Sequence, residues 1–227
     1  MTNVKLSKRL SAIANMVDKK SIVADIGCDH ALLDIYLTSN NISKKAYACD
    51  ITEGAINQAI RNIKLYNAKH VLTRFADGLN AIKKEDKVDT VIISGLGNHT
   101  IIEILTNNND ILDNVNTLII QSNTKVSEIR KNVTQIGYYI KDEKLVLERN
   151  IIYTIIKFSK GSRKYSKKDY LFGPILLKNR NLLFNKIIDE EINKNKKILN
   201  KIPRTKIFKR MKIYKEIMYL NKYKLKK

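Results

Sequence analysis

Three acidic residues stand at or just after the ends of short apolar runs: Asp25 in SIVADI, Asp50 after AYAC and Asp77 after VLTRFA. The carboxyl ends of parallel strands meet at one edge of an open α/β sheet, and cofactors bind at that edge. Gly27, in VADIGCDHALL, allows a tight turn and the close approach of a ligand to the backbone. Asp50 follows it by roughly 20 residues, the spacing of an acid that binds ribose hydroxyls. The pattern predicts a site for a nucleotide-type cofactor.

The charge of this site favours S-adenosylmethionine over a dinucleotide. The chain has no G-x-G-x-x-G motif after this strand, because Asp29 holds the position of the second glycine after Gly27. A carboxylate at Asp25 disfavours a pyrophosphate and suits the ammonium group of the cofactor's methionyl part. Asp77 would accept a hydrogen bond from the adenine amine. Each acid alone has an ordinary alternative: a strand-to-helix turn, a helix N-cap at Asp50, or an Asp-Gly turn.

A fourth element is the loop SGLGNH, Ser94–His99, after the fourth apolar run. Its two glycines would expose backbone close to the transferring methyl group, and Asn98 and His99 would contact the substrate. The chain has no Asn-Pro-Pro-Tyr motif, which many amino-methylating enzymes use to hold an exocyclic amine. The target atom is therefore expected to be of another kind.

Hydrophobic periodicity places these residues on alternating strands and helices, which is typical of a parallel α/β sheet. Seven strands are predicted, the last two as a hairpin: Ser21–Ile26, Lys45–Asp50, Val71–Phe75, Val88–Ser94, Thr117–Gln121, Tyr138–Leu147 and Ile151–Phe158. Helices are predicted over Leu6–Met16, Ala31–Ser39, Gly54–Tyr66, Thr100–Thr106 and Val126–Ile136. An antiparallel end fits a Rossmann-like class I methyltransferase sheet better than a dehydrogenase sheet. On the first helix, Lys8 and Arg9 would bind phosphate or simply face solvent.

The basic residues are concentrated toward the C-terminal end. The net charge is +21; residues 1–159 hold 21 Lys and Arg against 17 Asp and Glu, and residues 160–227 hold 22 against 5. A lysine-rich composition alone would spread the excess evenly. We therefore predict two domains: residues 1–159 bind the cofactor, and residues 160–227 bind a polyanion. A lysine-rich surface that is merely solvated is the alternative.

The basic segment has its own helical pattern. Tyr165 and Tyr170 lie in a linker, where they would stack on bases or simply pack. Two long helices, Ile175–Asn200 and Arg204–Leu225, are predicted on either side of Pro203. The apolar seam between them is predicted from Leu176, Leu183, Ile187 and Ile188 on the first helix and Ile207, Met211, Tyr214, Met218 and Leu225 on the second. Together they predict an antiparallel coiled-coil hairpin with its lysines outside.

Other compositional features exclude several classes of protein. Cys28 and Cys49 are the only cysteines and lie in apolar surroundings, which argues against a disulfide framework and against a zinc site. No apolar run is long enough to span a bilayer, and no cationic and apolar leader is present. We expect a cytoplasmic monomer that uses neither metal nor membrane.

Residues 5–155 resemble the bacterial tRNA (adenine-22-N1)-methyltransferase family closely, and the tail resembles it in architecture. The resemblance rests on LSKRL with the following IA, on VADIGCDHALL, on the Asp50–Gly54 turn, and on ADGL and SGLGN in that order. It implies methyl transfer from S-adenosylmethionine to N1 of adenine in tRNA. The residues it assigns to the cofactor, together with those inferred above, are Asp25, Gly27, Asp29, His30, Asp50, Ile51, Asp77, Gly78 and Gly95.

The resemblance also implies that the loop Gly95–Asn98 holds the target base. Substrate contacts are then expected from Lys8, Arg9, Leu96, Gly97, Asn98 and His99. Leu96 and Asn98 depart from the Gly-Met-Gly-Gly of much of the family. N1 lies on the Watson–Crick edge, so the base must be unpaired or flipped out. Asp29 and Asn98 are the candidate catalytic residues, as acceptors of the proton that the methylated base loses.

Two other functions remain open from the residues. One is a methyltransferase for another RNA position or for a small molecule. The other is an RNA-binding module that keeps the fold without activity, although the three acids Asp25, Asp50 and Asp77 argue against it.

Overall fold

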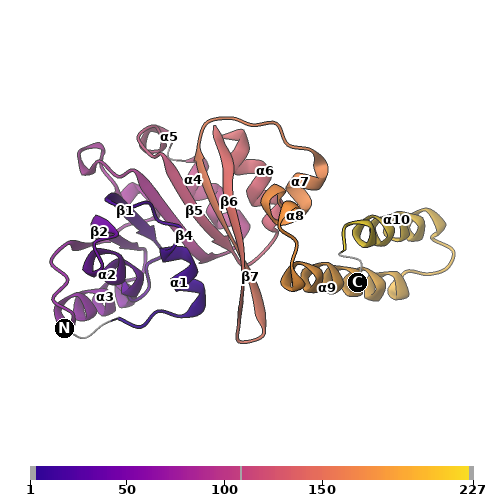
Figure 1. The fold of residues 1–227 in the computed structure, drawn as a ribbon, viewed down its shortest axis with the longest axis horizontal. Helices are drawn as coiled ribbons and strands as arrows, with labels where there is room; N and C mark the ends of the chain where they lie inside the picture. Colours follow the sequence, from indigo (N-terminus) through magenta and orange to yellow (C-terminus); the bar gives the residue numbers. More distant parts are fainter. Residues whose placement is uncertain (1–3, 108, 225–227) are drawn as a thin grey trace. The chain divides into compact units, whose positions relative to one another are not determined.

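The computed structural model describes residues 4–107 and 109–224 (Figure 1). The chain forms two compact units, Met1–Gly173 and Pro174–Lys227. In the part of the chain that is described, no helix combines the length and the apolar character needed to cross a membrane.

The first unit is built on a seven-stranded sheet in the order β3-β2-β1-β4-β5-β7-β6. The strands are β1 Ser21–Ile26, β2 Ser43–Asp50, β3 Val71–Phe75, β4 Thr90–Leu96, β5 Thr117–Ser122, β6 Tyr138–Glu148 and β7 Ile151–Lys160. The first five are parallel, and β7 runs antiparallel to both β5 and β6. The predicted methyltransferase-type sheet with an antiparallel end is confirmed.

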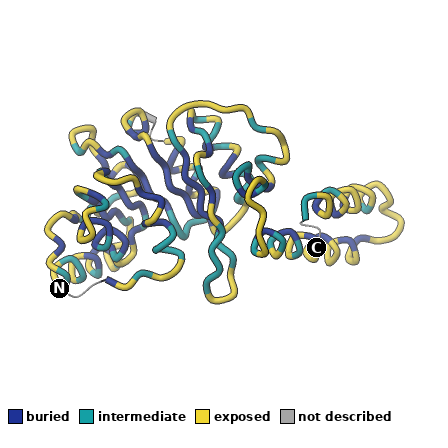
Figure 2. The backbone as a smooth tube through the Cα atoms, viewed as in Figure 1, coloured by how far each residue is buried: buried dark blue, intermediate teal, exposed yellow. Residues whose placement is uncertain are grey.

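The middle of this sheet is covered on both faces, which explains its sequence. Every residue of β5 is buried, and Val23, Ala24, Ile92 and Ile93 of β1 and β4 are buried as well (Figure 2). Parallel strands covered by helices on both sides need such unbroken apolar runs. Because β1 and β4 are neighbours while β2 and β3 continue in the other direction, the order of the strands reverses at β1, where open sheets bind ligands.

Two groups of helices pack against the sheet. The helices are α1 Lys8–Ala14, α2 Leu32–Ser39, α3 Glu53–Leu65, α4 Asn98–Thr106, α5 Asn109–Leu112, α6 Val126–Gln135 and α7 Lys167–Phe172, with 3₁₀ turns at Gly78–Ala81 and Lys84–Asp86. Helix α2 contacts α1 and α3, whereas α4 contacts α5 and α6. This grouping is what right-handed crossovers on either side of the switch between β1 and β4 produce.

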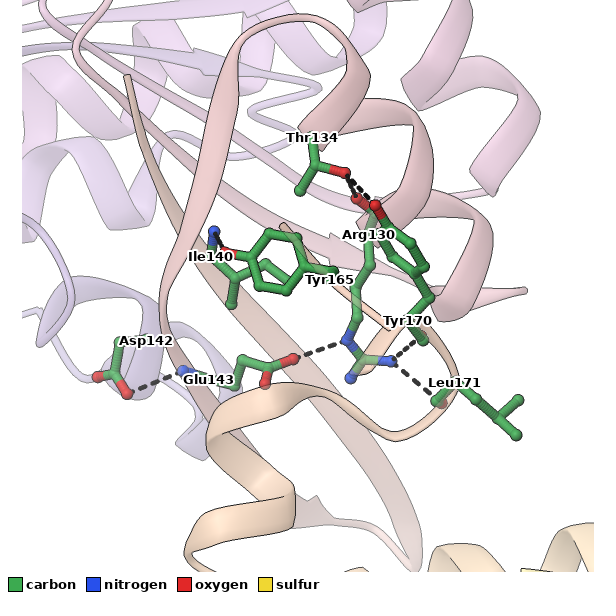
Figure 3. Close-up of polar contacts among 8 residues, drawn as sticks. All are labelled: Arg130, Thr134, Ile140, Asp142, Glu143, Tyr165, Tyr170 and Leu171. Atoms are coloured by element: carbon green, nitrogen blue, oxygen red, sulfur yellow. Dashed lines mark hydrogen bonds and ion pairs between the residues drawn. The ribbon is translucent and has the colours of Figure 1, made fainter. Parts of the chain in front are cut away.

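The segment after β7 packs onto the sheet unit. Arg130 is buried; its Nε donates to Glu143 Oε1 at 2.7 Å, and its Nη1 donates to the main-chain oxygens of Tyr170 and Leu171 at 3.1 and 3.3 Å (Figure 3). Tyr165 Oη accepts the Ile140 N–H at 2.8 Å. The first unit therefore runs through Gly173, whereas the sequence places a boundary at residue 160.

Gly173 closes this segment for a steric reason. Its φ is +88°, and a Cβ there would collide with the Glu143 carboxylate and with Arg130. The rings of Tyr165 and Tyr170 lie 5.8 Å apart at a tilt of 56°, so both tyrosines make packing contacts within the first unit. A base-stacking role for them stays a prediction.

The second unit is a helical hairpin formed by α8 Pro174–Lys178, α9 Leu182–Lys201 and α10 Ile207–Tyr223. Helices α9 and α10 are antiparallel: Arg210 at the start of α10 donates to the oxygens of Leu199 and Ile202, while Lys224 pairs with Asp189 at 2.6 Å. The predicted hairpin is confirmed.

The predicted seam of that hairpin is wrong on α10. Ile207, Met211, Tyr214 and Met218 are exposed, and Leu225 lies outside the described residues. The buried residues are Ile213, Ile217 and Leu220 on α10 and Phe184, Ile188, Ile192, Asn195 and Leu199 on α9. Both stripes of α10 have spacings of three and four residues, so periodicity alone could not choose between them.

Candidate active site

A pocket of about 340 Å³ lies at the carboxyl ends of β1, β2 and β4. Its volume is in the range of ~300–1,000 Å³ that is usual for small-molecule sites. It is lined by Arg9, Leu10, Asp25, Gly27, Cys28, Asp29, His30, Leu32, Leu33, Asp50, Ser94, Gly95 and Leu96. The sequence motifs after the first, second and fourth strands therefore converge, together with the first helix.

The floor of the pocket is the turn between β1 and α2. Gly27 has φ +77°, and the N–H groups of Gly27 and Cys28 donate to the Cys49 oxygen at 2.8 and 3.0 Å. Asp29 and Ala31 have φ values of +51° and +53°, in the left-handed region that residues other than glycine rarely adopt. Residues held in such conformations concentrate at ligand sites.

Asp50 connects two of the loops that form the pocket. Its Oδ1 accepts the N–H and the hydroxyl of Thr52, each at 2.8 Å, and its Oδ2 accepts the Asp29 N–H at 3.4 Å. Thr52, not Asp50, is the N-cap residue of α3. The carboxylate is thereby held at the pocket wall, in the place expected for an acid that binds ribose.

Asp25 is 4% exposed and lies against a second acid that our sequence reasoning missed. Asp34, in the first turn of α2, is fully buried, and the two side chains contact each other. Burial raises the pKa of Asp25 to about 7, opposed by Asp34 and by the positive charge of Arg9. Burial and the neighbouring Asp25 raise the pKa of Asp34 well above its usual value. An acid within the apolar stretch LLDIYL was the signal that could have revealed it.

Arg9 reaches the pocket from α1, whereas Lys8 is exposed. The Arg9 Nη1 donates to Gln121 Oε1 at 2.6 Å, and its guanidinium lies 5.4 Å from the centre of the Tyr153 ring. Gln121 Oε1 also accepts the Gly95 N–H at 3.1 Å. Through Gln121, Arg9 therefore links the first helix to the end of β4, and its expected contact with phosphate stays a prediction.

The end of β4 and the start of α4 are fixed through their polar groups. Gly95 has φ +84°, and its carbonyl accepts from Asn123 Nδ2 at 2.6 Å. Asn98 is 2% exposed: its Nδ2 donates to Glu128 at 2.6 Å, and its Oδ1 accepts from the Thr124 hydroxyl at 2.8 Å. Asn98 does not line the pocket, so these bonds favour an anchoring role over the predicted catalytic one.

The remaining candidates lie at or beyond the rim. Asp29 and His30 line the pocket, are largely exposed and approach each other at 3.3 Å. Leu96 lines it beside Gly27. The candidates outside the lining are Ile51, Asp77 and His99, which are exposed, Gly97, which is half-buried, and Gly78, which is buried. A cofactor that extends past the hollow toward β3 would be needed to bring Ile51, Asp77 and Gly78 into contact with it.

Among the described residues, no three His, Cys, Asp or Glu side chains are placed to hold an ion together. Cys28 and Cys49 are buried free thiols, and burial raises the pKa of both.

The chain matches known proteins over nearly its whole length. Residues 23–223 match the family described as tRNA (adenine(22)-N(1))-methyltransferase. The Bacillus subtilis protein of that description is 32% identical over 209 residues, which are 89% of this chain and 87% of the relative.

Solved structures agree in fold and in length. The Mycoplasma capricolum TrmK structure, in complex with S-adenosyl-homocysteine, is 34% identical with a TM-score of 0.86, covering 96% of this chain and 97% of that one. The Streptococcus pneumoniae Sp1610 structure, in complex with S-adenosyl-L-methionine, is 29% identical with a TM-score of 0.90, covering 96% and 99%. The chain belongs to the tRNA (adenine(22)-N(1))-methyltransferase family.

Proposed function

We propose that this protein transfers a methyl group from S-adenosylmethionine to N1 of adenine 22 in tRNA. The observation that carries the proposal is the match to this family across both units, together with the acid-lined pocket at the switch point of the sheet. The relatives solved with S-adenosylmethionine and with its demethylated product support the choice of cofactor.

The residues of the pocket fit the chemistry of that cofactor. Asp25 lines it with a carboxylate for the ammonium group, and Asp50 offers one for the ribose hydroxyls. Gly27, which has no side chain, leaves the backbone of the floor open to a ligand. When bound, S-adenosylmethionine supplies a sulfonium-activated methyl group, which the N1 lone pair takes up as the carbon–sulfur bond breaks.

The protein's remaining task is to position the adenine and to accept a proton. N1 is already nucleophilic, so much of the acceleration comes from holding it in line with the methyl group. Gly95 and Leu96 line the pocket, and we propose that the segment Gly95–Gly97 holds the flipped base. The methylated adenine is a cation until it loses its N6 proton. We assign the acceptor role to the exposed Asp29 carboxylate, with His30 at 3.3 Å to hold it.

The second unit is proposed to hold the tRNA by its phosphates. Residues 174–227 contain 17 Lys and Arg against 4 Asp and Glu. Three of these lysines, Lys194, Lys197 and Lys201, line a hollow of about 520 Å³ along α9. Phosphate contacts of this kind set affinity without reading sequence, so discrimination would come from the pocket. Since one chain supplies the whole pocket, we propose a monomer that acts on tRNA in the cytoplasm.

Transfer of labelled methyl from S-adenosylmethionine tests this function. The purified chain is offered tRNA with adenine at position 22, the same tRNA with guanine there, and total RNA without tRNA. We expect label only with the first, and digestion with mass spectrometry should find N1-methyladenosine at that position. Label in the guanine-22 tRNA would point to another RNA position. Cofactor binding with no RNA methylation would point to a small-molecule substrate.

A further inference from the structure

A buried acid behind the pocket has no part in the reaction as described above. Asp34 lies in the first turn of α2, is wholly buried and does not line the pocket. Within the described residues, no donor reaches either of its carboxyl oxygens with hydrogen-bond geometry. Its close polar neighbours are its own backbone N–H and the carboxyl of Asp25, which lines the pocket. The two carboxyls therefore form a contacting pair, with Asp25 at the pocket wall and Asp34 behind it.

The two carboxyls of this pair cannot be ionised at the same time. Two buried like charges in contact repel each other, and burial removes both carboxyls from most of the solvent that would stabilise a charge. A proton between the two carboxyls removes this conflict, because a protonated acid is a donor and its ionised neighbour is an acceptor. The surroundings decide which of the two keeps the proton.

The surroundings favour ionised Asp25 and neutral Asp34. Asp25 lies near the guanidinium of Arg9 and borders the pocket, where a cationic ligand group would meet it. Asp34 has only its own N–H and the N-terminal dipole of an eight-residue helix to support a charge. The dipole effect is small compared with the penalty of burying a carboxylate completely.

We propose that Asp34 is a positioning residue for the cofactor. It keeps its proton, donates a hydrogen bond to one oxygen of Asp25, and leaves the other oxygen of Asp25 as an anion for the ammonium group of S-adenosylmethionine. This inference rests on the proposed function, because it takes the ligand of the pocket to be that cofactor.

A pH dependence of cofactor binding follows. Five titratable or charged groups face Asp25 from the surrounding elements: Asp34 of α2, Arg9 of α1, Asp50 and Cys49 of β2, and Cys28 of the β1–α2 turn. On β4, the residue paired with Asp25 is the uncharged Ile92. Burial raises the pKa of Asp25 in the free protein to about 7. Below that pH, binding an ammonium group must expel a proton, so affinity falls by up to about tenfold per pH unit. Above pH 7 this dependence disappears.

The test is calorimetric titration with S-adenosyl-homocysteine between pH 5.5 and 7.5, where the amino-acid ammonium group of the ligand stays mostly protonated. Titrations in two buffers of different ionisation enthalpy give the protons released. Three variants are compared with the unchanged chain: Asp34→Ala, Asp34→Asn and Ser21→Ala. Ser21 is the matched control, since it is another buried side chain without a hydrogen-bond partner among the described residues, at the opposite end of β1.

The variant that removes the donor should bind more weakly, and the variant that keeps a donor should not. In Asp34→Ala, the charged form of Asp25 loses a hydrogen bond. We therefore expect the affinity at pH 7 to fall by about tenfold or more, and the midpoint of the pH dependence of binding to move to higher pH. In Asp34→Asn, the amide still donates, so both the affinity and the midpoint should stay close to those of the unchanged chain. Ser21→Ala should leave both unaltered.

Two outcomes would overturn the proposal. Tighter binding by Asp34→Asn at pH 6, with a lower midpoint, would mean that Asp34 carries the charge. An unshifted midpoint in a folded Asp34→Ala variant would mean that Asp34 does not act on Asp25. Carbon-13 NMR of the aspartate carboxyls in the unchanged chain gives an independent measurement, since Asp34 should remain protonated after Asp25 has ionised. If the unchanged chain does not bind the ligand at all, the proposed function fails instead.

Discussion

The two units of this chain are built to do different kinds of work. The first brings a few side chains to fixed positions: Asp50 accepts three hydrogen bonds, one of them from another loop, and Arg130 donates three that join α6 to β6 and α7. The second spreads 17 basic residues over 54 positions, with a narrow apolar seam to hold two helices together. The proposed chemistry of the first unit depends on the exact positions of its side chains, and the proposed RNA affinity of the second depends on its density of positive charge.

This difference determines how each unit should respond to substitution. Single changes in the first unit should have large effects that depend on the exact replacement and little on salt. Single changes of charge in the second should have small, cumulative effects that depend strongly on salt. The following four predictions test that contrast, beginning with the largest free-energy change.

Arg130→Met should destabilise the first unit by about 3–5 kcal/mol, the usual cost of breaking a buried ion pair by removing one partner. The substitution removes the guanidinium that holds Glu143 and the carbonyls of Tyr170 and Leu171 (Figure 3). Denaturant unfolding measures the loss. Lys131→Met, at the exposed neighbouring position, is the control and should change stability by less than about 0.5 kcal/mol. Equal effects would mean that this network does not secure residues 160–173 to the sheet.

Ile217→Ala should destabilise the hairpin by about 2–4 kcal/mol, whereas Met218→Ala should cost less than about 0.5 kcal/mol. Ile217 is 9% exposed in the seam with α9, and Met218 is 72% exposed. Loss of helical circular dichroism on heating separates the two variants. A larger loss of stability in Met218→Ala than in Ile217→Ala would instead support the seam predicted from the heptad-like spacing of Ile207, Met211, Tyr214 and Met218.

The packing face of α10 is a part of this fold that could not be predicted from the sequence. The sheet was predictable because Val91–Ile93 and Leu118–Ile120 are unbroken apolar runs, which are typical of covered parallel strands. On α10, two apolar stripes share one helix, and the choice between them depends on how α9 packs. The end of the first unit was missed for a similar reason. Nothing near Tyr170 in the sequence shows that its carbonyl bonds to Arg130, 40 residues earlier.

The site shows the same limit. Asp25, Gly27 and Asp50 were predictable because strand ends in a parallel sheet meet at one edge, and all three line the pocket. The partner of Asp25 was not predicted, because nothing in the sequence shows that Asp34, in the first turn of α2, packs against it. Asn98 looked available to a substrate because its loop is rich in glycine. Its actual partners, Thr124 and Glu128, are set by how α4 and α6 pack.

Asp50→Asn should weaken binding of S-adenosyl-homocysteine about 10- to 100-fold, the range expected when a hydrogen bond to a charged group is lost. The amide keeps one acceptor oxygen for Thr52 or for Asp29, but not the charged pair of oxygens that joins both loops. Calorimetry at two salt concentrations measures the effect, which should be nearly the same at both. A loss that disappears in low salt would mean that Asp50 acts through long-range charge and not through contact.

Replacing Lys194, Lys197 and Lys201 together by Gln should weaken tRNA binding and leave cofactor binding unchanged. These lysines line the hollow on α9, and removing one lysine–phosphate pair lowers the slope of log affinity against log salt by ~0.7–0.9. The slope of the triple variant should therefore fall by up to about 2–3, and that of each single variant by less than one. Filter binding at several salt concentrations provides the slopes. The exposed lysines Lys64, Lys69 and Lys84 of the first unit, changed to Gln together, remove the same charge and form the control. An equal change of slope in the control would show that the whole surface, and not the second unit, gathers the tRNA.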